Sequence, residues 1–176
     1  GNSLAQVGIY TTCTYFATMV ILPNRPLQKI TSTLVAEAWK RNDMDQLQLI
    51  YRKSTITQLI IGTLVFFGLC INLDYIFQII PEQYSSGKWV IVFIGWFYLS
   101  DMAAGVNKDI LSNSPKYKKL SHWTIALIFV IILLNFVFIP SYGITGAAVS
   151  SCIARILYNV VAYSYVNRKF HLQPYS

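Results

Sequence analysis

The chain has few of the residues on which enzymes and soluble domains depend. Charged residues make up 12% of its 176 residues, with 14 basic, seven acidic and two histidines. An ordinary soluble domain carries roughly 25% charged residues, so this composition argues against one. The two histidines have no cysteine or acidic neighbour at metal-ligand spacing, and no glycine-rich phosphate loop, nucleophile elbow or HExxH pattern occurs. We therefore predict no catalytic residue, no metal and no cofactor, and a protein that is not an enzyme.

Cysteine is also scarce. Cys13, Cys70 and Cys152 are far apart in the chain, and each lies within an apolar stretch. Small apolar packing is the ordinary use of such cysteines, and neither a disulfide framework nor a metal-binding motif has this spacing.

Long apolar stretches are what the chain does have. Five of them, separated by short polar segments, cover about residues 7–38, 54–73, 89–107, 120–139 and 144–167. A helix needs roughly 20 mostly apolar residues to cross the core of a bilayer. Continuous rather than alternating apolarity favours helices over the strands of a barrel. The sequence therefore predicts an all-α, polytopic membrane bundle of five transmembrane helices.

The basic residues lie on alternate sides of these predicted spans. Four follow the first span, four follow the third and two follow the fifth, against one (Lys88) in the other connections; the ten are Lys40, Arg41, Arg52, Lys53, Lys108, Lys116, Lys118, Lys119, Arg168 and Lys169. The excess of Lys and Arg in cytoplasmic loops predicts that the N-terminus of this chain is outside and its C-terminus cytoplasmic. Because the basic residues flank spans instead of forming one patch, we predict no nucleic-acid binding.

The first stretch contains polar residues at an unusual depth. Arg25, Gln28 and Lys29 follow Pro23 and surround Pro26, and two prolines so close together predict a kink or a local break. The stretch is longer than the bilayer core, so the two cations could extend to lipid phosphates at the inner interface. Alternatively they face a water-filled cavity, because intramembrane cations usually mark the path of a substrate or ion.

The third and fifth stretches carry further candidates. Asp101, Gly105 and Lys108 share one face of the third stretch. Asp101 either pairs with a cation from another span or lies in the inner headgroup layer. In the fifth, Arg155 and Asn159 follow a run of small residues that suits close helix packing, and Arg155 is near the middle of its span, which favours a cavity.

A short polar segment joins the first two stretches. Asp43 followed by Gln46 is typical of a helix N-cap with a capping-box partner. Leu47, Ile50 and Tyr51 would form one apolar face, so this segment predicts a short interfacial helix on the cytoplasmic surface.

Four segments of the chain resemble bacterial polysaccharide exporters. They are Val7–Tyr10, the run LQLIYRKS at 47–54, EQYSSG at 82–87 and, most specifically, IPSYGITGAA at 139–148. These exporters are the O-antigen-type lipid-linked oligosaccharide flippases of the multidrug/oligosaccharidyl-lipid/polysaccharide exporter superfamily. Members typically have two six-helix lobes around a central cavity. The resemblance implies that residues 1–176 form the last five helices of a twelve-helix transporter, and that an N-terminal lobe is missing from this chain.

The resemblance also implies a function. A flippase of this kind moves an undecaprenyl-linked oligosaccharide, such as a repeat unit of O-antigen lipopolysaccharide or capsule, across the bacterial cytoplasmic (inner) membrane by alternating access. The expected substrate-binding residues are Arg25, Gln28, Lys29, Asp101, Arg155 and Asn159. The alternatives are a drug or metabolite exporter of the same superfamily, a membrane-embedded glycan-processing enzyme, and a purely structural membrane subunit.

Overall fold

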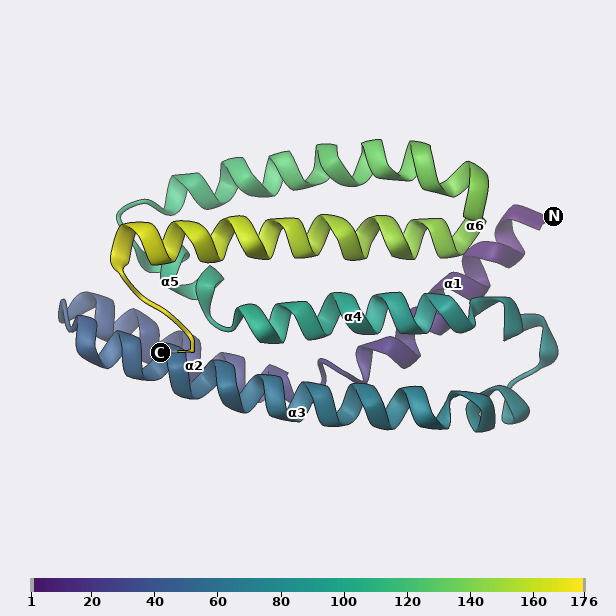
Figure 1. Cartoon of the computed structure of the whole chain (residues 1–176), viewed down its shortest axis with the longest axis horizontal. Coiled ribbons are helices and arrows are strands. Elements are labelled where there is room, and N and C mark those ends of the chain that lie inside the picture. Colours follow the sequence, from purple (N-terminus) through teal and green to yellow (C-terminus); the bar gives the residue numbers. More distant parts are fainter. Residues whose placement is uncertain (1, 176) are drawn as a thin grey trace.

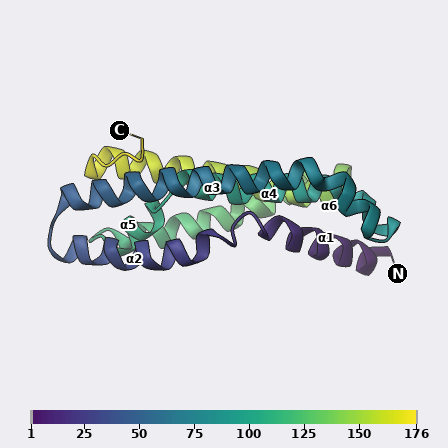
Figure 2. The ribbon, with the colours of Figure 1, turned by 90° about the horizontal axis from the view of Figure 1, so that it is seen from below.

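The computed structural model describes residues 2–175, and in that part every regular element is a helix. The helices are α1 (Asn2–Thr18), α2 (Asn24–Lys40), α3 (Met44–Ile79), the 3₁₀ helix η1 (Glu82–Gly87), α4 (Lys88–Ala104), α5 (Asn107–Asn113) and α6 (Tyr117–Phe170). They form an elongated bundle (Figure 1). Seen from below, α1 and α2 lie along one side of the bundle and α3 along the other (Figure 2). The predicted all-α class is confirmed.

Helix α6 folds back on itself. Gly143 has φ 55° and ψ −131°, a conformation that a side chain rarely tolerates, and the chain reverses there. The arm before Gly143 therefore lies beside the arm after it (Figure 1). The two arms correspond to the predicted spans 120–139 and 144–167.

The first apolar stretch is broken, as its prolines predict. Helix α1 ends at Thr18, and α2 begins at Asn24 after five residues of turn. Pro26 lies in the first turn of α2, where no N–H is needed for an intrahelical bond. Immediately after the break, the buried Asn24 side-chain amide donates a hydrogen bond of 3.3 Å to Gln58 Oε1 of α3.

The predicted interfacial helix is wrong. Asp43 does cap a helix, because its side chain accepts a 2.9 Å hydrogen bond from the Gln46 N–H. That helix, however, is α3, which continues without interruption to Ile79. Nothing between residues 44 and 61 is a proline or glycine, so no residue stops it. Leu47 and Tyr51 are fully buried in the bundle instead of lying on a membrane surface.

Within residues 2–175, two helices are long and apolar enough to cross a membrane. They are α3 and α6 from Lys118, and η1–α4 with α5 would make a third if that pair, which is bent by 55°, counts as one broken span. The protein is thus compatible with a membrane-embedded bundle, but the predicted five spans are not confirmed. Two features lower the number of spans below five. The first predicted span is broken into α1 and α2 of only 17 residues each, and the last two predicted spans form the single 54-residue helix α6 despite its reversal.

The connections that carry the basic residues gather at one end of the bundle. The α2–α3 turn, the α5–α6 turn and the C-terminus lie at this end, whereas the N-terminus, the α3–η1 turn and the reversal of α6 lie at the other (Figure 1). The arrangement agrees with the alternation in the sequence, and the orientation in a membrane stays a prediction.

Among the residues that the structure describes, the buried apolar side chains form two separate cores. One joins α1, the second half of α3, α4 and the start of the second arm of α6, around Val20, Phe66 and Ile91. The other joins α2, the first half of α3, α5 and the end of α6, around Leu47, Tyr51 and Ile110.

Candidate functional site

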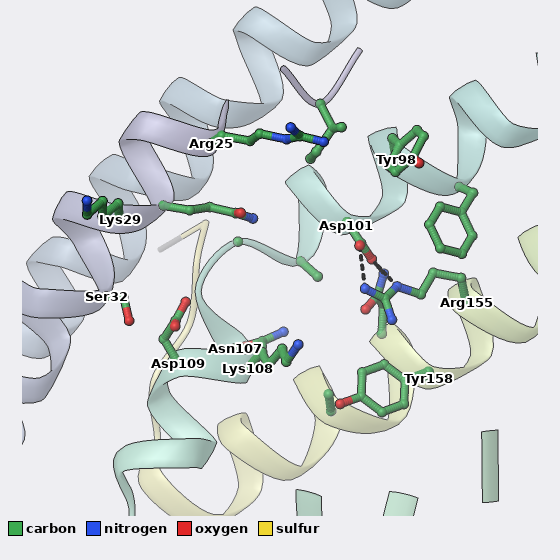
Figure 3. A pocket seen from close by; sticks show the side chains of 17 residues that line it. Arg25, Lys29, Ser32, Tyr98, Asp101, Asn107, Lys108, Asp109, Arg155 and Tyr158 are labelled. Carbon is green, nitrogen blue, oxygen red and sulfur yellow. Dashed lines mark hydrogen bonds and ion pairs between the residues drawn. The ribbon is translucent and has the colours of Figure 1, made fainter. Parts of the chain in front are cut away.

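A polar cavity of about 560 Å³ lies between α2 on one side and α4, α5 and α6 on the other. All six residues predicted as substrate-binding candidates line it: Arg25, Gln28, Lys29, Asp101, Arg155 and Asn159. They come from three helices that are far apart in the sequence (Figure 3). The structure therefore brings the predicted residues together, and their role in binding stays a hypothesis.

The wall formed by α4 and α6 is a connected network. The Arg155 guanidinium contacts the Asp101 carboxylate with both Nε and Nη2, the latter at 2.5 Å from Oδ2, and both side chains are mostly buried (24% and 17% exposed). Asn159 Nδ2 donates to the same carboxylate at 2.9 Å. A bidentate pair between planar groups is both strong and directional. Of the two interpretations of Asp101, the structure shows the pairing with a cation from another helix.

Aromatic rings surround this pair. The Arg155 guanidinium lies 5.2 Å from the centre of the Phe97 ring and 5.5 Å from that of Tyr158. Arginine is attracted to such ring faces by their quadrupole. The network of Asp101, Asn159 and two rings therefore holds Arg155 in one place.

The wall formed by α2 differs. Arg25 and Lys29, one helical turn apart, are exposed, and Arg25 extends from α2 toward α4 (Figure 3). Among residues 2–175 neither side chain forms a salt bridge. Both residues thus line the cavity, and within residues 2–175 neither charge is compensated by an ion pair.

The floor of the cavity holds Lys108, which the sequence placed on one face with Asp101, and Asp109, which the sequence did not single out. Lys108 and Asp109 of α5 line it, and Asp109 faces Ser32 of α2 (Figure 3). The expectation that Asp101 and Lys108 share one continuous helix is wrong, because α4 ends at Ala104 and α5 begins at Asn107. The glycine between them was the available signal for this bend.

Gly105 makes the bend possible. Its φ of 61° and ψ of −133° match those of Gly143, and a Cβ at this position would collide with Thr55 Oγ1 of α3. Glycine is the residue that adopts this conformation without steric cost. Next to it, the buried Tyr51 hydroxyl donates to Asn107 Oδ1, which fixes the start of α5.

The lining carries more positive than negative charge. Four cations (Arg25, Lys29, Lys108 and Arg155) face two carboxylates (Asp101 and Asp109), so their formal sum is +2. Clustered cations bind anions, and Arg and Lys are the side chains that bind phosphate oxygens. Within the described residues, no group of three His, Cys, Asp or Glu side chains is placed to hold a metal. The arrangement is therefore suited to holding an anion.

Comparisons of the chain with protein-family models, with curated proteins and with solved structures found no match.

Proposed function

We propose that this protein is a membrane transporter that moves a lipid-linked oligosaccharide across the bacterial cytoplasmic membrane. The observation that carries the proposal is the cavity with an excess of cations, two of which, Arg25 and Lys29, form no salt bridge within residues 2–175. Intramembrane charge is costly and marks a functional path. The diphosphate that joins a lipid to its glycan has the charge that these residues complement.

The residues that line the cavity bind different parts of the substrate in this proposal. Arg25 forms two parallel hydrogen bonds to phosphate oxygens, whereas Lys29 acts as a flexible point charge. Gln28 and Asn159 line the same cavity and donate or accept hydrogen bonds to sugar hydroxyls. The glycan and diphosphate thus occupy the polar cavity while the lipid stays in the bilayer.

Transport requires access from both sides of the membrane in turn. In the proposed mechanism, the chain is part of the second lobe of a transporter of the polysaccharide-exporter type, and a partner lobe forms the facing wall. The two lobes rock around a fixed central site. The N-terminus of the chain lies outside and its C-terminus in the cytoplasm, in accordance with the distribution of Lys and Arg.

Reconstituted vesicles test this function. The intact transporter that carries this chain should move a fluorescent undecaprenyl diphosphate-linked oligosaccharide from one leaflet to the other and leave it chemically unchanged. The matched control is the same protein with Arg25→Ala and Lys29→Ala. Cleavage or extension of the glycan by the protein alone would support an enzyme instead, and movement of uncharged drugs but not of the lipid would support a drug exporter.

A further inference from the structure

A narrow apolar groove lies between the two arms of α6. It has a volume of about 130 Å³, and its lining carries no charge; Trp123, Ala126 and Leu127 contribute from the first arm and Ala154, Leu157 and Tyr158 from the second. The hollow exists because Ala126 and Ala154 have small side chains, whereas the residues around them are larger. The groove is therefore a hollow between side chains of two antiparallel helices.

The groove opens away from the bundle. No residue between 115 and 145 is buried, so the first arm of α6 lies at the edge of the molecule. Leu157 is 52% exposed and Val161 is 48% exposed, whereas Ala154 at the base of the groove is fully buried. In a bilayer, an apolar opening of this kind faces hydrocarbon.

Tyr158 lies at the boundary between the groove and the cationic cavity. Its side chain lines both spaces, and its ring lies 5.5 Å from the Arg155 guanidinium. Charge and apolar surface thus meet at one residue, with the cations on one side of Tyr158 and only uncharged side chains on the other. A ligand that spans the junction must have a charged end and a hydrocarbon end.

We propose that this groove holds the hydrocarbon chain of an anionic lipid whose headgroup occupies the cavity. The proposal rests on the proposed function and adds the path by which the chain leaves the cavity. The groove acts sterically, since a chain that moves from bilayer to apolar groove gains no hydrophobic free energy. It lets the first part of the chain pass Tyr158 while the headgroup remains on the cations.

Photocrosslinking tests the occupant. p-Benzoylphenylalanine in place of Leu127 should capture a radiolabelled long-chain polyprenyl diphosphate in phosphatidylcholine nanodiscs. Inorganic pyrophosphate at about ten times its Kd should reduce this labelling by about tenfold, because it competes for the cavity. The same probe in place of Phe129, an exposed residue of the first arm outside the groove, should give labelling that pyrophosphate does not change.

A groove-filling variant gives a second readout. Ala126→Phe should weaken binding of the long-chain diphosphate by about tenfold, the scale of an overfilled site. Its affinity for pyrophosphate should stay that of the unsubstituted protein, and Ile125→Phe, on the neighbouring exposed position, should change neither affinity. These results would support the groove as the site of the chain.

Two results would overturn the proposal. Labelling at position 127 that pyrophosphate does not reduce, together with an unaffected Ala126→Phe variant, would show that bilayer lipids alone fill the groove, and the proposed function would stand. Absence of pyrophosphate and polyprenyl diphosphate binding in the unsubstituted protein would instead refute both proposals.

Discussion

The two walls of the cavity hold their cations in opposite ways. On the α4–α6 wall, Arg155 is mostly buried, bound through Nε and Nη2 to Asp101 and placed against Phe97 and Tyr158. On the α2 wall, Arg25 and Lys29 are exposed, and neither has an acidic partner among residues 2–175. A buried cation in a bidentate pair is compensated within the fold, whereas the α2 cations can be compensated by a ligand. We therefore propose a structural role for Arg155 and a binding role for the α2 wall.

Removal of Arg155 should have the largest effect on stability. Arg155→Ala leaves the Asp101 carboxylate without its cation in a mostly buried site, and the free energy of unfolding should fall by about 4 kcal/mol. Chemical unfolding in detergent measures this fall. Arg25→Ala, the matched arginine on the other wall, should change it by less than about 0.5 kcal/mol. Equal losses in the two variants would abolish the distinction between the walls.

Substitution of Gly105, at the floor of the cavity, should have the second-largest effect on stability. Gly105→Ala forces both an unfavourable φ and a collision with Thr55, so we expect a loss of about 3 kcal/mol. Gly143→Ala shares the unfavourable φ but has open space around its Cβ, and the expected loss is about 1 kcal/mol. Comparing the free energies of unfolding of the two variants separates the cost of the collision with Thr55 from the cost of the backbone strain. A larger loss for Gly143→Ala would refute the account of the α4–α5 bend.

Arg25 distinguishes a cavity residue from an interfacial one. Arg25→Ala should weaken binding of a lipid diphosphate by about tenfold, the scale of a charged hydrogen bond. Arg25→Lys should restore only part of this affinity, because the bidentate geometry is lost. Glycan export in cells and binding in detergent both report the difference. Full rescue by lysine would instead indicate a cation that only contacts lipid headgroups at the interface.

The smallest expected effect concerns the C-terminal tail behind the α4–α6 wall. The Tyr175 hydroxyl donates a 2.7 Å hydrogen bond to the Ala103 carbonyl, next to the end of α4. Tyr175→Phe should cost less than about 1 kcal/mol, since the residue is partly exposed. Hydrogen exchange should accelerate at the end of α4 but not in α2. Tyr142→Phe, an exposed tyrosine in the first arm of α6, is the control and should leave exchange in α4 unchanged.

The sequence predicted much of this arrangement because its strongest signals are local. Apolar runs define the helices, Pro23 and Pro26 predict the break before α2, and Asp43 predicts the start of α3. Polar residues within apolar runs were the only candidates for a cavity, and all six line it. Local patterns therefore suffice to predict the cavity residues when an apolar stretch contains only a few polar side chains.

The remaining features depend on contacts between distant segments. Tyr51 is buried against α5 only because the bundle closes over it, so its apolar face was misread as a surface helix. Lys108 joins the cavity because Gly105 bends the chain against Thr55, a contact 50 residues away in the sequence that no local pattern encodes. The pairing of Asp101 with Arg155 likewise joins two helices and was only one of two open interpretations.

The central claim is that the α2 wall binds the anion and the α4–α6 wall supports it. The direct test compares Kd values for a polyprenyl diphosphate and for the uncharged polyprenol in two double variants, Arg25→Ala with Lys29→Ala and Asp101→Asn with Arg155→Gln. We predict that the first variant loses preference for the diphosphate at an unchanged unfolding temperature, and that the second keeps most of that preference. Full diphosphate preference in the variant without Arg25 and Lys29 would contradict the account.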